Sequence, residues 1–360
     1  MTEVKETSPL LGRTVTETPK TRFWIVQALA DVTVEPAILL HSVAYAIDQV
    51  YLTNIIIDKV CLVHFKYDAE VCENLDTGNY TVEQNQVQRL TSDYNVYNHW
   101  VEYLPSLVSI LIQGAWEDVR GRRLPVLRSF VGSLLTALCF LANAYWWSLP
   151  APFLLLSWVP LGVSGGNIGL NTNACIFVSA VSGSRSRTFR LSAMEWIKYG
   201  CYPLAIYLAM IIYSNGGYVT LYGFQVILYI VAVVYLAFCL EEPHSTKLQD
   251  EQTSSMSICE VFSTSWLTRT FAVTWRPRAA GGRTTLIANM AILLLVVFSQ
   301  GVKNYFFLYT RKMFEWEYQN YTDWTLVDYP VKAIAAVHTR GRALYGPCTL
   351  EAVHSMDRAL

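Results

Sequence analysis

The chain has 360 residues, of which 53% are hydrophobic and 15% are charged, whereas about 25% of the residues of an ordinary soluble domain are charged. This composition indicates a protein embedded in lipid rather than a soluble enzyme or binding domain. The net charge of -1 argues against a nucleic-acid partner, because binding to phosphate groups requires a basic surface.

The first 20 residues are polar and lack the apolar core that a secretory signal requires. We therefore expect a cytosolic N-terminus. Within this segment Glu6, Leu10 and Leu11 form an acid-xxx-Leu-Leu pattern, which adaptor complexes read as an endosomal or lysosomal address. A chance match is the alternative, and the plasma membrane is then the expected location.

Seven apolar runs are long enough to cross a bilayer as helices. They cover Val34–Ile57, Trp100–Trp116, Leu124–Trp147, Pro152–Val181, Leu191–Tyr213, Tyr218–Leu240 and Thr285–Tyr309. We therefore expect an all-α membrane protein in contact with lipid. Its parts would be the cytosolic segment 1–33, a six-helix transmembrane bundle over 34–240, a cytosolic linker over 241–283, a seventh helix over 284–309 and an extracytosolic tail over 310–360.

The charges of the connections predict the orientation of the chain. Arginine and lysine residues gather after the second, fourth and sixth helices, which places these connections in the cytosol. The connection 58–98 is acidic and holds a glycosylation sequon at Asn79, and a second sequon begins at Asn320. Both would face the lumen during synthesis, so we expect both to carry glycan.

Cys61 and Cys72 lie in the same acidic connection, where oxidation is permitted. A disulfide between them and two separate thiols are both open at this point. The sequence shows no metal-ligand cluster and no nucleophile constellation. We therefore expect no metal, no cofactor and no enzymatic activity.

A Gly-xxx-Asp-xx-Gly-Arg-Arg pattern stands between the second and third expected helices. Its members are Gly114, Asp118, Gly121, Arg122 and Arg123. The glycines permit close helix approach and a tight turn, and the arginines can bind carboxylates or the carbonyl end of a neighbouring helix. Such a cluster can hold a cytosolic gate shut. The alternative is that the arginines only orient the chain in the membrane.

This pattern resembles the cytosolic loop motif of the major facilitator superfamily. The segment Ser184–Arg190, followed by Glu195, resembles the junction of the fourth and fifth helices in the family of the proton-coupled folate transporter and the thymic stromal cotransporter, which is solute carrier family 46. The run Val34-Glu-Pro-Ala resembles that family's first helix. The resemblance implies a major facilitator type N-terminal six-helix bundle plus about one helix of the second bundle, with Asp118 and Arg122 at the gate and Glu195 in proton coupling. The chain departs from the family in having seven expected spans instead of about twelve, and in lacking an acid in the Gly-rich part of the fourth helix.

Ionisable residues inside apolar spans cost about 2.5 to 3.5 kcal/mol each on insertion scales, so they indicate function. Glu195 and Lys198 are three residues apart on the fifth helix, and His41 and Asp48 are seven apart on the first. Each pair shares a helix face. Either pair can take part in proton coupling or line a cavity. A structural ion pair and a hydrogen-bonded histidine are the alternatives.

The fourth expected helix is rich in glycine and asparagine. Gly162, Gly165 and Gly166, with Asn167 and Asn171, make one side of it polar and easily broken. Broken helices of this kind line solute cavities in transporters. Close helix packing through small residues is the alternative.

These features together predict a secondary transporter that moves a polar organic solute, folate-like or another organic anion, with protons by alternating access. The alternative is a shortened family member that does not transport and acts as a binding or regulatory partner. Because only one helix of a second bundle is expected, we predict that the chain alone does not concentrate its solute. We then expect it to self-associate or to pair with a full-length relative.

Overall fold

The computed structural model of the protein describes residues 32–75, 80–241 and 282–303, together with residues 275, 309–310, 313–314, 324 and 327. These residues form an all-helical fold. The elements are α2 (Glu35–Lys59), the π-helix η1 (Val60–His64), α3 (Ala69–Glu73), α4 (Thr81–Arg120), α5 (Arg123–Tyr145), α6 (Pro152–Leu156), α7 (Val159–Ser164), α8 (Gly166–Val181), α9 (Ser184–Gly200), α10 (Tyr202–Cys239) and α14 (Gly282–Lys303).

Three stretches of the described chain combine the length and the apolar composition that crossing a membrane requires. They are Arg123–Tyr145, Pro152–Val181 and Ser186–Cys239. The first two coincide with the third and fourth expected spans. The third stretch contains the fifth and sixth expected spans. The count of seven spans, with the division into bundle, linker and tail, stays a prediction.

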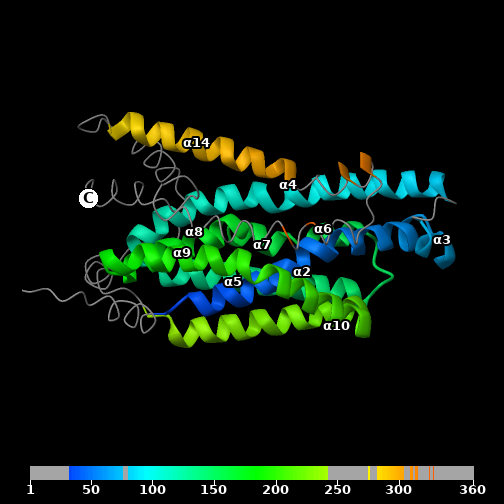
Figure 1. Ribbon diagram of the computed structural model, residues 1–360, viewed down its shortest axis with the longest axis horizontal. Coiled ribbons are helices and arrows are strands. Elements are labelled where there is room, and N and C mark those ends of the chain that lie inside the picture. Colours follow the sequence, from blue (N-terminus) through cyan, green and yellow to red (C-terminus); the bar gives the residue numbers. More distant parts are fainter. Residues whose placement is uncertain are drawn as a thin grey trace, which may run out of the picture.

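The helix α10 reverses direction at Gly217. This residue has a φ of 65° and a ψ of -160°, a conformation that glycine adopts without the steric cost of a Cβ atom. Ala209 and Leu221, on either side of it, pack into one apolar cluster with the end of α2. Leu236 packs into a second cluster with Val34 at the start of α2. The two halves of α10 are therefore antiparallel (Figure 1).

The helix α4 is much longer than the expected span Trp100–Trp116 and covers 40 residues. The part of the acidic connection 58–98 from Thr81 onward is therefore helical. Val87, Thr91, Tyr94 and Asn98 are buried, and their spacing of three and four residues places them on one face of the helix. An apolar run does not detect such a segment, because its other faces are polar.

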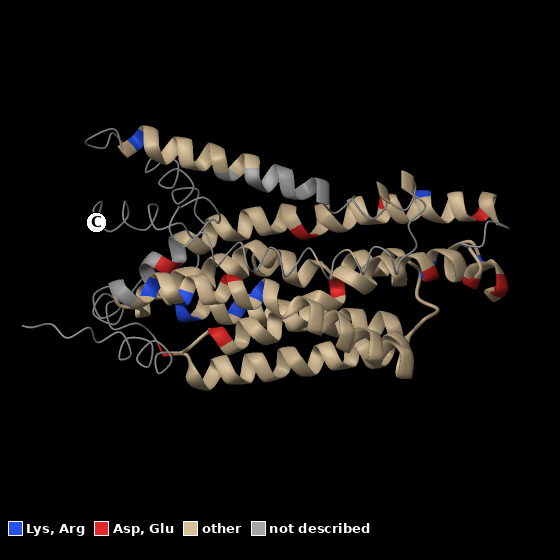
Figure 2. Ribbon diagram, viewed as in Figure 1, with Lys and Arg blue, Asp and Glu red and all other residues tan. Residues whose placement is uncertain are grey.

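The long helices α2, α4, α5 and α10 run side by side along the long axis of the molecule (Figure 1). Both α2 and α5 pack along α10, while α7 contacts α4 and α5. Lys and Arg gather toward the end at which α2 begins, and the acidic residues of α3 lie at the opposite end (Figure 2). This is the distribution that the positive-inside rule expects of a membrane protein with a cytosolic N-terminus.

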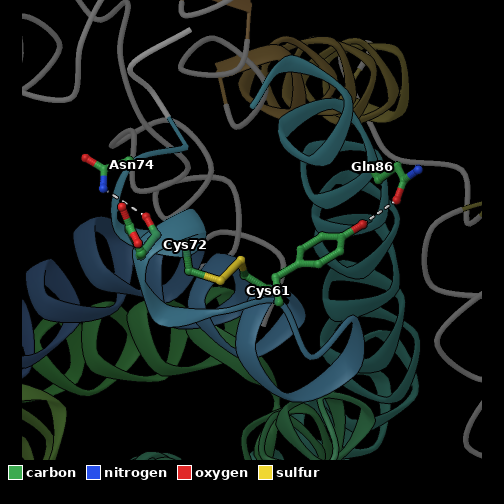
Figure 3. Close-up of a disulfide and its surroundings, with 6 residues drawn as sticks. Cys61, Cys72, Asn74 and Gln86 are labelled. Carbon is green, nitrogen blue, oxygen red and sulfur yellow. Dashed lines mark hydrogen bonds between the residues drawn. A yellow bond between two sulfur atoms is a disulfide. The ribbon is translucent and has the colours of Figure 1, made fainter. Parts of the chain in front are cut away.

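Cys61 and Cys72 are joined by a disulfide, with their Cα atoms 5.9 Å apart (Figure 3). The bond links η1 to α3. Beside it, the Tyr67 hydroxyl donates a hydrogen bond of 2.6 Å to Oε1 of Gln86 on α4. The end of α2, α3 and the extension of α4 thus form one connected structure.

Candidate functional site

The fourth apolar segment is broken between α7 and α8. Gly165 and Gly166 have φ values of 109° and 65°, which lie in the left-handed region where side chains with a Cβ atom are disfavoured. The glycines are therefore required by the break itself. Gly162 has a second role, because a Cβ atom there would meet the backbone oxygens of Val101 and Glu102 at 2.9 Å. Here α7 packs directly against the backbone of α4.

Side chains from neighbouring helices satisfy the carbonyl groups that the break exposes. Val163 O accepts hydrogen bonds from Ser109 Oγ of α4 at 2.7 Å and from Arg128 Nη2 of α5 at 3.1 Å. Ser164 O accepts one from Gln113 Nε2 at 3.0 Å. Such pairing is what makes a broken helix tolerable at membrane depth, because an unpaired carbonyl group in lipid costs several kcal/mol.

On the other side of the break, the carboxylate of Glu102 lies at the first turn of α8. Its Oε1 accepts hydrogen bonds from the backbone N of Asn167 at 3.4 Å and from Nδ2 of the same residue at 3.1 Å. The Glu102 residue is 5% exposed. Asn171 donates from Nδ2 to Asn167 O at 2.9 Å. The two predicted asparagines are thus next to each other, with a buried carboxylate beside them.

Asp48 and His41 both face the second half of α10, as their shared face on the first helix predicts. Asp48 Oδ2 accepts a hydrogen bond of 2.8 Å from Gln225 Nε2, whereas its Oδ1 has no hydrogen-bond partner among the described residues. His41 Nδ1 lies 3.1 Å from the hydroxyl oxygen of Tyr229. Both side chains are buried. Asp48 therefore keeps one acceptor atom available in the interior.

A buried ion pair joins the start of α2 to α9. Arg190 Nε lies 2.6 Å from Glu35 Oε1, and its Nη2 donates to Glu35 Oε2 at 3.1 Å and to Thr33 Oγ1 at 3.0 Å. The Nη1 atom donates to Ser182 Oγ at 3.0 Å. This guanidinium thus connects α2, the end of α8 and α9.

Glu195 and Lys198 form the ion pair that their spacing predicts, with Nζ and Oε1 2.6 Å apart. Their side chains are 28% and 22% exposed, so the pair lies at the edge of the packed interior.

In the Gly-xxx-Asp-xx-Gly-Arg-Arg pattern, Gly114 is exposed and Gly121 has a φ of 94°. Arg123 Nη2 donates to Ala237 O near the end of α10 at 2.7 Å, which is a bond to the carbonyl end of a neighbouring helix.

Several predicted positions fall outside the part of the chain that the structure describes. They are the sorting residues Glu6, Leu10 and Leu11, the sequon residues Asn79 and Asn320, and the side chain of Asp118. Their assignments stay predictions.

Four residues of the site were not predicted from the sequence. Glu102 lies inside the expected span Trp100–Trp116, so the rule that singled out Asp48 would have found it. Glu35 was noted only as part of an opening pattern, and its partner Arg190 only as the last residue of the segment that resembles the junction of the fourth and fifth helices. Gln225 is neutral, and nothing in the sequence alone distinguishes it.

The chain is similar to several transporters. It is 28% identical over 336 residues to the "Probable peptidoglycan muropeptide transporter SLC46" of Drosophila melanogaster, covering 86% of this chain and 61% of that protein. It is 29% identical over 171 residues to the proton-coupled folate transporter of Rattus norvegicus, covering 45% of this chain and 36% of that protein. The relatives of this chain are SLC46 transporters.

A further SLC46 relative is the human "Lysosomal proton-coupled steroid conjugate and bile acid symporter SLC46A3", at 25% identity over 294 residues, covering 77% of this chain and 60% of that protein. The chain thus spans less than two thirds of the length of these SLC46 relatives. No protein-family model matches it.

Among solved structures, the human organic anion transporter MFSD10 (TETRAN) matches with a TM-score of 0.60 and 12% identity, covering 89% of this chain and 72% of that one. This likeness shows the fold, which is that of a major facilitator transporter. With SLC46 relatives and this fold, the chain is a multi-pass membrane protein, and its relatives point to transport rather than catalysis.

Proposed function

We propose that the protein is a secondary active transporter of a polar organic solute, folate-like or another organic anion, which it moves together with protons by alternating access. The break between α7 and α8 carries the proposal, because broken helices near the middle of the membrane form solute sites in transporters. The names of the relatives, which include proton-coupled folate and bile acid carriers, support the solute class.

In this proposal the residues 34–240 form the N-terminal six-helix bundle of the major facilitator fold, and α14 begins the second bundle. The solute site lies on the side of the break at Asn167 and Asn171. Their amide groups can donate hydrogen bonds to carboxylate or carbonyl oxygens of a solute. The gate is the Gly-xxx-Asp-xx-Gly-Arg-Arg pattern, which begins in the last turns of α4 and ends at the first residue of α5, where Arg123 already binds the end of α10.

Proton coupling is assigned to the pair of Glu195 and Lys198, with Asp48 and His41 as interior groups. A carboxylate that loses its lysine partner is more easily protonated than one that keeps it. Exchange of the partner of Glu195 during rocking of the helices would therefore change its affinity for protons, which is the physical requirement for coupling.

The test is uptake of labelled folate and of a labelled bile acid by the purified chain in vesicles with an imposed pH gradient. Because only one helix of a second bundle is expected, we expect the chain alone to exchange at least one of them in a pH-dependent way without net accumulation. In Glu195→Gln, solute exchange should persist while its pH dependence becomes flat. Lys66→Gln is a matched control, because Lys66 lies outside the expected spans, in the segment between η1 and α3. Binding of solute without exchange across the membrane would favour the binding or regulatory alternative, and an unchanged pH profile in Glu195→Gln would make that residue structural.

A further inference from the structure

Glu102 is a buried carboxylate to which none of the roles above has been assigned. It projects from α4 to the first turn of α8, where its Oε1 atom receives the two hydrogen bonds from Asn167 at 3.1 and 3.4 Å. Both donors are neutral. An ionised carboxylate that is removed from water and held only by neutral donors is costly, whereas its protonated form is not. The environment of Glu102 therefore suits a group that gains and loses a proton.

The charged groups around Glu102 favour this behaviour. The helices α6, α7 and α8 contain no Asp, Glu, Lys, Arg or His. On α2 the facing acid is Asp48, whose charge interacts with that of Glu102. On α4 itself the neighbours are Tyr103, which also interacts with its charge, and His99, which stacks on Tyr103. On α5 the Arg128 guanidinium is bound to Val163 O, on the far side of the break.

The position of Glu102 gives such a proton a mechanical consequence. The short helix α7 is held firmly, since a Cβ atom at Gly162 would collide with the α4 backbone and one at Gly132 would collide with Ser164 Oγ. The link from α7 to α8 consists of Gly165 and Gly166, which tolerate large changes of φ and ψ. The carboxylate of Glu102 is therefore a clamp that fixes the start of α8 relative to α7 and α4.

We propose that Glu102 is a proton-binding residue whose ionised carboxylate holds the first turn of α8 and whose protonation releases it. The N–H groups of Asn167 form charge-assisted hydrogen bonds to the ionised carboxylate, which are about twice as strong as bonds between neutral groups. The protonated form keeps one carbonyl oxygen as a neutral acceptor, so protonation weakens its hold on Asn167. The proton comes from water and binds a carboxylate oxygen. No other bond is made or broken. The proposal relies on proton-coupled transport for its biological purpose, but its test needs no solute.

The test is infrared difference spectroscopy of the full chain in lipid nanodiscs during a pH titration, in which a protonated carboxyl group shows a separate carbonyl band. We expect a band that grows as the pH falls and that is absent in Glu102→Gln. The control Glu70→Gln, which removes an exposed carboxylate of α3, should keep this band. The substitution Glu102→Gln retains the size of the side chain and one acceptor oxygen, so the variant should fold.

A second variant tests the contact with α8. Asn167→Ala removes the side-chain donor, which stabilises the ionised form more than the protonated one, so the midpoint of the band should move to higher pH by about one unit, the equivalent of a tenfold change in proton affinity. A structural role for Glu102 would not produce this shift.

Three results would overturn the proposal. The carbonyl band could persist in Glu102→Gln, the band that is absent from this variant could be independent of pH in the wild-type protein, or the midpoint could stay unshifted in Asn167→Ala. Failure of the solute uptake described above would instead contradict the proposed transport function. It would not affect the result of the Glu102 titration, which needs no solute.

Discussion

The ion pair between Arg190 and Glu35 should contribute more to folding than any charge on the surface. Arg190 is 2% exposed and donates to both oxygens of Glu35, to Thr33 and to Ser182. Replacing it with Met leaves the Glu35 carboxylate buried without its cation. Removal of one partner of such a pair costs about 3–5 kcal/mol. The equilibrium constant for folding of Arg190→Met should therefore be roughly a thousandfold lower than that of the wild-type protein.

The double variant Arg190→Met with Glu35→Met should recover much of this loss, because it buries no charge. Replacement of a whole buried pair by apolar side chains is often neutral or stabilising. Full recovery is not expected. Glu35 Oε2 also accepts hydrogen bonds from the backbone N atoms of Thr33 and Val34 at the start of α2, and loss of a helix-start acceptor costs about 1 kcal/mol.

The assay is reversible unfolding in mixed micelles with increasing denaturing detergent, followed by circular dichroism. Arg89→Met is the matched control, since Arg89 is an exposed residue of α4 and should change stability by less than about 0.5 kcal/mol. The reasoning is refuted if Arg190→Met loses less than about 1 kcal/mol, or if the double variant is no more stable than Arg190→Met alone.

Four further predictions follow from the structure and the sequence. Gly162→Ala should lose about 1–3 kcal/mol by overpacking, whereas Gly223→Ala, where a Cβ atom meets nothing within 4 Å, should lose none in the same unfolding assay. Cys61→Ser should destabilise the protein by about 2–4 kcal/mol, and wild-type protein should show the bridged peptide by mass spectrometry without reduction. Asn79 should carry glycan while the N-terminus stays accessible to protease added to intact microsomes, because their outer face is the cytosolic one, so an Asn79→Gln band that does not shift would contradict the topology. Arg122→Gln should slow solute turnover with little loss of equilibrium binding, and a loss of binding in folded protein would remove Arg122 from the gate.

Local features of the sequence were sufficient for much of the architecture. The apolar runs predicted the positions of α5, of the broken segment over 152–181 and of the two halves of α10, because a helix in lipid must be apolar over its own length. The spacing of Glu195 and Lys198 was sufficient to predict their ion pair, since residues three apart on a helix are neighbours. The glycines at the break also have a local cause, which is their positive φ.

The sequence by itself determined that the chain is an all-helical membrane protein with a transporter-like loop motif, because composition, periodicity and short motifs act within a few turns of one helix. Only the tertiary structure decided which charged groups meet. Glu102 reaches Asn167 across 65 residues of sequence, and Arg190 reaches Glu35 across 155. These pairings depend on which helices pack together and on their rotation about their own axes, which the pattern of a single helix leaves undetermined because its buried face can be set against any of several neighbours.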